Sequence, residues 1–287
     1  MLDWWCIRAS TVAVAAYCTV RLFKVMLQKT IFAPFYSITE YKDNVVYVFE
    51  FPRKWTRQML NLSPFAVKLE AWLRCKNVEY QIVETNKFSK STRQIPYVLY
   101  NGIEYTDTVL MIDQLTAVLD LPKDDLTPEQ EGISRAFIRM VDEGLAINHF
   151  LFRYYHLADD FFHHLFRPRE KRWLVRLFKF LFQRAIKIKA GGLGRHTKSE
   201  FGEIGKDDVR AISRFLGKKK FTFGETINTV DCAIFGQLSQ IFYIDLDFPY
   251  KAIVDTECPN IMPYLDRIKD ALWPDWDEMV NKEPFYD

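Results

Sequence analysis

A serine stands directly before a proline at the start of a helical pattern, in the stretch NLSPFAVKLEAWLRC (residues 61–75). Ser63 is a favoured residue type for a helix N-cap, and Pro64 suits the first turn because an N–H there would have no helical partner. A hydroxyl at a helix N-terminus could also donate a hydrogen bond to a thiolate, whose charge the helix dipole stabilises. The sequence leaves both interpretations of Ser63 open, a cap and a thiolate donor.

Two further residue pairs could bind a ligand. Ile95-Pro96 stands at the entry to an apolar, strand-like run, where a proline cannot donate to the strand ladder and can adopt the cis form. Asp107 and Thr108 stand where the next helical pattern begins, and the pair Thr106-Asp107 is typical of a helix cap. Each pair therefore has a structural interpretation beside a ligand-binding one.

A metal site is the weakest of the candidate sites. His156, Asp160 and His164 recur at four-residue spacing and would share one helix face, but a single face offers a divalent ion only a shallow, wet site. The five cysteines are scattered and form no CxxC pair, which indicates free thiols in a reducing compartment. We expect no bound metal.

The elements that would position these residues follow a β-α-β-β-β-α order. VVYVFEF (residues 45–51) and VEYQIVE (78–84) are strand-like and enclose the helix that begins at Ser63. Asn101-Gly102 is typical of the two-residue turn of a hairpin, which predicts a third and a fourth strand. A helix is expected to follow from residue 107 to 119.

From residue 122 on, the sequence predicts helices only. Thr127 and Pro128 begin a helical pattern that continues toward Pro168, and a second pattern covers residues 169–188. Residues 198–217 form another, and Asn228 with Asp231 forms an N-x-x-D cap before an apolar helix. We expect an α+β chain with three parts, residues 1–43, 44–120 and 121–287.

The first of these parts contains a hydrophobic segment. WWCIRASTVAVAAYCTVRLFKVML reaches the length of a membrane span, with its charged residues near the ends, where long side chains can reach the interface. We expect an uncleaved single-pass anchor, with a signal peptide, a mitochondrial presequence and a soluble helix as alternatives. Arg21, Lys24 and Lys29 outnumber Arg8, so the positive-inside rule places the globular body in the cytosol.

Charge excludes one class of partner. The formal net charge of +2 over 287 residues argues against a general nucleic-acid binder. In one interpretation, the basic region at residues 167–189 complements an acidic tail from residue 241 or is simply solvated; in the other, it contacts an anionic membrane surface. We favour the first interpretation.

A small β-α-β-β-β-α unit followed by helices resembles the glutathione transferase fold. GGLGRHTKSEFGEIGKDD and FTFGETINTVDCAIFGQLSQ, with VVYVFEFPR and NLSPF, are similar to the failed axon connections and metaxin-like branch of that fold. The hydrophobic N-terminus makes the chain most similar to the nematode cadmium-responsive proteins of this branch. The resemblance extends from about Val45 to the C-terminus. It implies an anchor and linker (1–43), a thioredoxin-like domain (44–120) and an all-helical transferase-like domain (121–287).

The resemblance also implies a glutathione site. Ser63 would donate to the sulfur, the backbone of Ile95 before Pro96 would pair with the cysteinyl part, and Asp107 with Thr108 would hold the γ-glutamyl end. Where the fold can place a thiolate-stabilising tyrosine, this sequence has Glu50, and a carboxylate there would repel a thiolate. That departure puts ordinary transferase catalysis in doubt.

Two functions follow from the resemblance. The first is a membrane-anchored, transferase-like protein in the response to cadmium or related stress, which binds glutathione. The second is a non-enzymatic adaptor of the metaxin-like or axon-development type, with a protein partner or a second copy of the chain. Because metaxin anchors are typically C-terminal and this tail ends in NKEPFYD, we expect a lysosomal or other endomembrane rather than the mitochondrial outer membrane.

Overall fold

The structure is a computed structural model that describes residues 40–165, 179–180, 183–184, 186, 191 and 195–280. The predicted anchor and linker (1–43) lie almost entirely outside these residues, as do most of residues 166–194 and the last seven residues. Among the described residues, no helix has the length and apolar character that a membrane crossing requires.

A four-stranded mixed sheet forms the first part of the chain. β1 (Val46–Glu50) lies between β2 (Tyr80–Glu84) and β3 (Tyr97–Tyr100), and β4 (Ile103–Thr106) pairs with β3. β1 and β2 are parallel, whereas the other two pairs are antiparallel. The predicted succession of strands and helices along the chain is confirmed, and the parallel pair needs the crossover helix that the sequence placed between them.

The β3–β4 hairpin turns at Asn101 and Gly102, whose φ angles are +48° and +76°. Two successive positive φ values define the type I′ turn that an Asn-Gly pair favours. The peptide bond between Ile95 and Pro96 is cis, and Pro96 directly precedes β3. Both features agree with the local sequence.

Two helices accompany the sheet, α2 (Pro64–Cys75) and α3 (Thr108–Val118). Alternate residues of β1 enter two apolar clusters: Val46 and Val48 pack with α2 in the main core, while Tyr47 and Phe49 belong to a smaller cluster. By the period of two, Glu50 belongs to the face that α2 covers. A short 3-10 turn, η1 (Arg53–Trp55), lies between β1 and α2.

The remaining elements are helical. They are α4 (Pro128–Arg139), η2 (Met140–Leu145), α5 (Ala146–Leu151), η3 (Phe152–His156), α6 (Ala158–Asp160), η4 (Phe161–Leu165), α8 (Lys198–Leu216), α9 (Thr229–Phe242), η6 (Pro249–Ile253), α10 (Ile261–Leu272) and α11 (Trp276–Met279). The predicted helix from Thr127 is therefore a succession of α-helical turns with wider π-helical ones, η2, η3 and η4. Capping boxes begin α4, α8 and α9, the last through the predicted Asn228 and Asp231.

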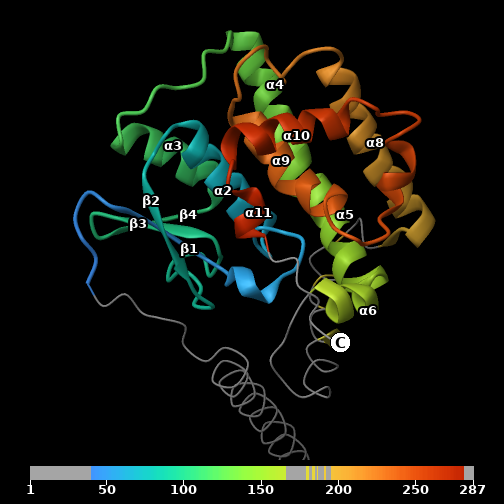
Figure 1. Cartoon of the computed structure of the whole chain (residues 1–287), viewed down its shortest axis with the longest axis horizontal. Helices are drawn as coiled ribbons and strands as arrows, with labels where there is room; N and C mark the ends of the chain where they lie inside the picture. The colour runs from blue at the N-terminus through green and yellow to red at the C-terminus, as the bar shows by residue number, and fades with distance from the viewer. Residues whose placement is uncertain are drawn as a thin grey trace, which may run out of the picture.

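α2 joins the two parts of the molecule. In Figure 1 the sheet lies on the left with α2 and α3, the helices from α4 onward lie on the right, and α2 lies between the sheet and α9. A Cβ atom added to Gly236 of α9 would lie 2.7 Å from the carbonyl oxygen of Pro64 and 2.9 Å from the backbone nitrogen of Lys68. The backbones of α2 and α9 are in contact because residue 236 has no side chain.

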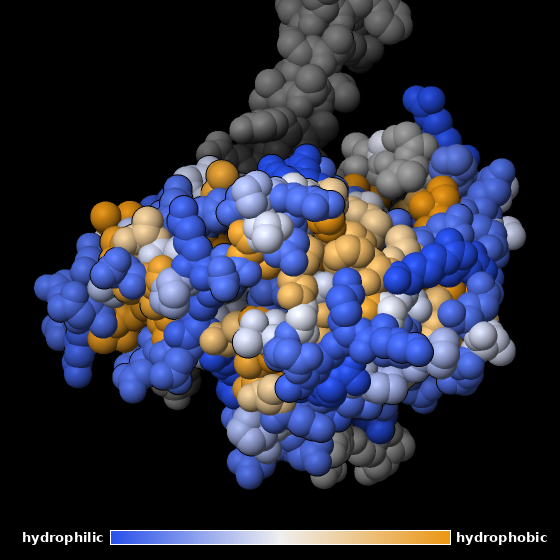
Figure 2. Space-filling view, turned by 90° about the horizontal axis from the view of Figure 1, so that it is seen from above, coloured by the Kyte–Doolittle hydropathy of each residue, from blue (hydrophilic) through white to orange (hydrophobic). Residues whose placement is uncertain are grey.

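The core runs through this junction. Trp72 of α2 and Phe235 of α9 are both at most 1% exposed and belong to one apolar cluster. The face shown in Figure 2 is mostly hydrophilic, with apolar residues in groups between hydrophilic ones. The sheet part and the helical part thus share one core, so a shift at α9 displaces α2 as well.

Candidate functional site

One edge of the sheet gathers the residues singled out in the sequence. Phe49 pairs with Tyr97, and Tyr97 pairs with Thr106. The next residue outward on each strand, Glu50, Pro96 and Asp107 respectively, therefore lies at the same edge. This edge also contains the carboxyl end of β2, because β1 and β2 are parallel. The register places residues from three separate stretches of sequence side by side.

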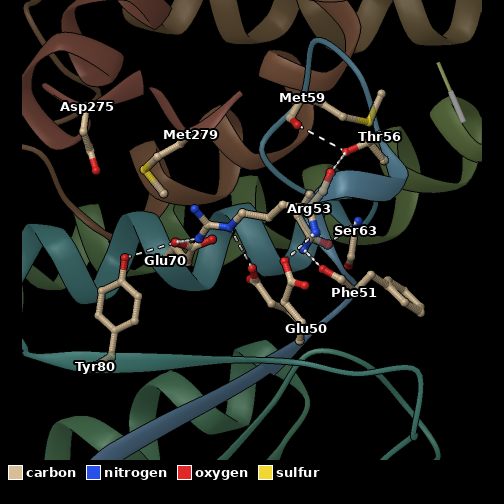
Figure 3. A network of polar contacts seen from close by, with 12 residues as sticks. Glu50, Phe51, Arg53, Thr56, Met59, Ser63, Glu70, Tyr80, Asp275 and Met279 are labelled. Atoms are coloured by element: carbon tan, nitrogen blue, oxygen red, sulfur yellow. Dashed lines mark hydrogen bonds and ion pairs between the residues drawn. The ribbon is translucent and has the colours of Figure 1, made fainter. Parts of the chain in front are cut away.

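Ser63 reaches this edge through a short, hydrogen-bonded loop. The amide of Asn61 donates to the carbonyl of Phe51 (2.7 Å), and the backbone N–H of Ser63 donates to the side-chain oxygen of Asn61 (2.9 Å). Phe51 directly follows Glu50, so the start of α2 is attached to the end of β1. Figure 3 shows Ser63 beside Phe51 and Glu50.

The hydroxyl of Ser63 does not cap α2. Ser63 occupies the N-cap position with an extended backbone, and its carbonyl accepts from Ala66 N–H (3.1 Å), but its side chain makes no capping hydrogen bond. Ser63 is 7% exposed. Ser63 thus occupies the cap position, but its hydroxyl makes no capping hydrogen bond. The hydroxyl remains able to donate a hydrogen bond to a ligand.

Asp107, in contrast, is a true cap. Its φ angle is +65°, and its Oδ1 accepts from the N–H of Val109 at the start of α3 (3.0 Å). Thr108 next to it is buried. The second carboxylate oxygen of Asp107 is not used for capping, so the same side chain could accept from an ammonium group of a ligand.

Ile95 offers backbone groups for an extended ligand. Within the described part of the chain, neither its N–H nor its carbonyl bonds to another backbone group. Buried backbone N–H and C=O groups almost always have hydrogen-bond partners in native structures. Ile95 is 9% exposed, and it directly precedes the cis peptide bond at Pro96. An extended peptide segment laid against it would supply the missing partners.

A buried charge cluster lies beneath the site, and it was not predicted. Arg53 donates from Nε to Glu50 (3.1 Å) and from Nη2 to Glu70 of α2 (2.6 Å), and both carboxylates are fully buried. The hydroxyl of Tyr80 donates to the same oxygen of Glu70 (3.0 Å). Figure 3 shows Arg53 between the two carboxylates, with Tyr80 reaching Glu70 from β2. The signal in the sequence was Glu70, a carboxylate on the apolar face of the predicted helix.

The two carboxyl groups of this cluster share one cation. Oε2 of Glu50 and Oε1 of Glu70 are buried, and neither has a hydrogen-bond partner among the described residues. Burial, reinforced by the charge of Glu70, raises the pKa of Glu50 well above its usual value although Arg53 acts in the opposite direction. The neutral form of Glu50 is thus favoured, which reduces the repulsion of a thiolate that the sequence suggested.

This cluster predicts a pH-dependent effect of Glu50→Gln. Because the pKa of Glu50 is raised in the folded state, its contribution to stability is present at low pH and is lost as pH rises through that pKa. Glutamine resembles the neutral acid and can donate to Oε1 of Glu70. We expect the free energy of unfolding in urea to exceed that of the wild type by about 1 kcal/mol at pH 8. At pH 4 the two should agree, and an equal difference at both values would contradict the assignment.

The described residues contain no group of three or more histidine, cysteine or carboxylate side chains that could hold a metal ion. The side chain of His164, a member of the candidate metal site, lies outside the described atoms.

Buried residues that the sequence did not single out are Asn61, Arg153 and Gln240, which hold the loop before Ser63. Arg153 could have been noticed as a lone charge in the apolar run HFLFRYYH.

The comparison with known proteins identifies the family. A model of the glutathione S-transferase N-terminal domain matches residues 64–160, and a model of the glutathione S-transferase C-terminal domain matches residues 205–268. Failed axon connections of Drosophila melanogaster is 31% identical over 260 residues, which cover 85% of this chain and 62% of that protein. The chain belongs to the failed axon connections branch of the glutathione S-transferase family. It spans less than two thirds of the length of its Drosophila relative.

More distant members of the family share the fold. An isoprene-epoxide glutathione S-transferase of Rhodococcus sp. is 23% identical over 222 residues, 73% of this chain and 92% of that enzyme. The β-etherase LigF of Sphingobium sp. superposes with a TM-score of 0.58 at 13% identity, over 82% of this chain and 99% of LigF. A glutathione S-transferase of Ceriporiopsis subvermispora, solved in complex with glutathione, gives 0.56 at 14% identity, over 79% and 98%. These structures show the transferase fold of this chain.

Proposed function

We propose that this member of the family binds glutathione at the sheet edge formed by Ser63, Ile95-Pro96 and Asp107-Thr108. One observation carries the proposal: the strand register and the Asn61 loop bring these three stretches to one edge, and each offers an unused polar group there. Thiol, peptide and amino acid groups would each meet a matching partner. The complex of the Ceriporiopsis relative with glutathione supports this choice of ligand.

The chemistry of the proposed site is thiolate transfer. The hydroxyl of Ser63 would donate to the sulfur of glutathione, and the N-terminus of α2 would favour its negative charge. The sulfur would form a bond to one carbon of an epoxide as the bond from that carbon to the ring oxygen breaks, and the resulting alkoxide oxygen would take up a proton from water. The backbone of Ile95 would hold the cysteinyl peptide, and Asp107 the ammonium group. A small epoxide is the proposed electrophile class, by similarity to the Rhodococcus relative.

Calorimetry with glutathione tests the proposal, with Ser63→Ala and Asp107→Ala beside the wild-type chain. We expect Asp107→Ala to weaken binding about tenfold, because it removes one charge-assisted contact. Ser63→Ala should change the affinity less, but should lower the rate of conjugation to an epoxide roughly 100-fold, the typical effect of losing one donor to a developing anion.

Matched controls are available in the same chain. Ser199→Ala and Asp113→Ala replace the same residue types on exposed positions of α8 and α3, away from the sheet edge. They should bind glutathione as the wild type does. If the wild-type chain does not bind glutathione, the proposed function is wrong, and if both site variants bind normally, the site is misplaced.

An adaptor role is the second candidate. The relative with the highest identity given above is a Drosophila protein named for failed axon connections, and no reaction is part of that name. The buried Glu50 at the end of β1, in place of a tyrosine hydroxyl, also favours this role. A chain that folds but neither binds glutathione nor consumes an epoxide would support it.

Membrane attachment and the cadmium response stay predictions from the N-terminal sequence and the resemblance. Fractionation of cells that express the full chain would test the anchor. Attachment predicts that the protein stays with membranes at alkaline pH and that removal of residues 1–43 releases it.

A further inference from the structure

The loop that leads to Ser63 is held from the helical part of the molecule by two buried side chains. Arg153 donates from Nη1 to the carbonyl of Leu62 (3.0 Å), the residue before Ser63. Gln240 of α9 donates from Nε2 to the carbonyl of Asn61 (2.9 Å). Arg153 also donates from Nη2 to the side-chain oxygen of Gln240 (2.6 Å), so each of the two positions the other.

Arg153 has no counter-ion among the described residues. It is fully buried, no carboxylate of those residues lies within ion-pair distance of it, and its Nε has no hydrogen-bond partner there. The faces of Phe161 and Tyr154 lie 5.3 and 5.7 Å from its guanidinium carbon. Carbonyls and ring faces offset part of the cost of burying a cation, but they leave its net charge in place.

The titratable groups around this cation do not neutralise it. Tyr154 is the titratable group that acts on Arg153 most strongly, and it belongs to the same helical run. Burial and the charge of Arg153 lower the pKa of His149, one turn earlier, so His149 is neutral. Among the groups of α9 and the loop before Ser63, Arg153 donates hydrogen bonds only to the amide oxygen of Gln240 and to backbone carbonyls. Arg153 therefore keeps its positive charge where it contacts the residue before Ser63.

A neutral side chain could hold the Leu62 carbonyl equally well, since one N–H donor is sufficient for that bond. The charge needs a separate explanation, because burying an unpaired cation lowers the stability of the folded state. Arg153 also lies in η3, a π-helical turn, and such turns are frequent at functional sites.

We propose that Arg153 is a positioning residue of the glutathione site, where it fixes the loop before Ser63 and supplies a permanent positive charge for the ligand's thiolate. This inference rests on the proposed function. A cation in a buried site is screened less than in water, so the charge of Arg153 favours the ionised form of the bound thiol and lowers the pH at which that thiol ionises.

The test follows the ultraviolet absorbance of the thiolate of glutathione bound to the full chain across a pH range. Arg153→Met removes the charge at similar length, and Arg153→Lys keeps the charge but loses the planar fork. Gln240→Met removes the other half of the loop clamp and keeps the charge. Glutathione affinity by calorimetry and unfolding in urea are measured for each variant.

We expect Arg153→Met to raise the ionisation midpoint of the bound thiol by at least about one unit. Arg153→Lys and Gln240→Met should weaken glutathione binding, with midpoints that stay close to that of the wild type. If Arg153→Met does not fold, the lysine variant decides the question, because a midpoint as high as that of free glutathione in a folded Arg153→Lys protein would contradict the proposal.

Two negative results are distinguishable. No binding of glutathione to the wild-type chain would overturn the proposed function and this inference together. Binding to the wild type, with one midpoint shared by the wild type and a folded Arg153→Met variant, would overturn this inference alone and leave Arg153 a structural clamp.

Discussion

Arg53→Met is expected to destabilise the protein by about 3–5 kcal/mol at pH 8, the usual cost of removing one partner from a buried ionic group. Glu50 and Glu70 are fully buried, and Arg53 bonds to both. Without the guanidinium, their charges would repel each other in a medium that cannot screen them. Without Arg53, the folded state would favour the protonated forms of Glu50 and Glu70. The loss of stability should therefore be smaller at pH 5 than at pH 8. Urea unfolding at both pH values measures it.

Two controls separate charge from packing. The triple variant Arg53→Met, Glu50→Gln, Glu70→Gln contains no charge in the cluster and should regain most of the lost stability. Arg210→Met removes an arginine with the same side-chain exposure of 18%, but its nearest carboxylates, Asp207 and Glu257, are 73% and 45% exposed. It should change stability far less. Equal losses for Arg53→Met and Arg210→Met would contradict the role of burial.

Gly236→Ala is expected to force α2 and α9 apart. The added methyl group would lie 2.7 Å from the carbonyl oxygen of Pro64 and 2.9 Å from the backbone nitrogen of Lys68, and backbone atoms cannot move aside as a flexible side chain can. Overpacking of this kind costs roughly 1–3 kcal/mol, which exceeds the gain that alanine normally brings to a helix. Since Pro64 follows Ser63, glutathione binding should weaken as well.

Gly132→Ala is the matched control for this substitution. Gly132 lies in α4, and a Cβ atom there would meet nothing within 4 Å. The same change should therefore stabilise the protein by about 0.5–1 kcal/mol. Urea unfolding and glutathione calorimetry of both variants test the pair. Gly236→Ala with wild-type stability and affinity would show that the α2–α9 contact tolerates a methyl group.

Local sequence was sufficient for several turns, caps and elements. The Asn101-Gly102 turn, the cis-compatible Ile95-Pro96 pair and the Asn228 cap all depend on residues within a few positions of one another, and the structure has each of them. The same short-range chemistry predicted α2 from Ser63-Pro64 and the succession of the four strands along the chain. The domain bounds and the role of the first 43 residues stay predictions.

Tertiary structure alone decided the electrostatics of the candidate site. The sequence showed Glu50 as a bare carboxylate, but its burial against Glu70 depends on how α2 packs on β1. The hydrogen bonds from Arg153 to Leu62 and from Gln240 to Asn61 join residues 91 and 179 positions apart. No periodicity or motif encodes such contacts, because they form only when the sheet part and the helical part share one core. The sequence thus determined which groups are present at the sheet edge, and the packing of α2 between β1 and α9 decided which charges they meet.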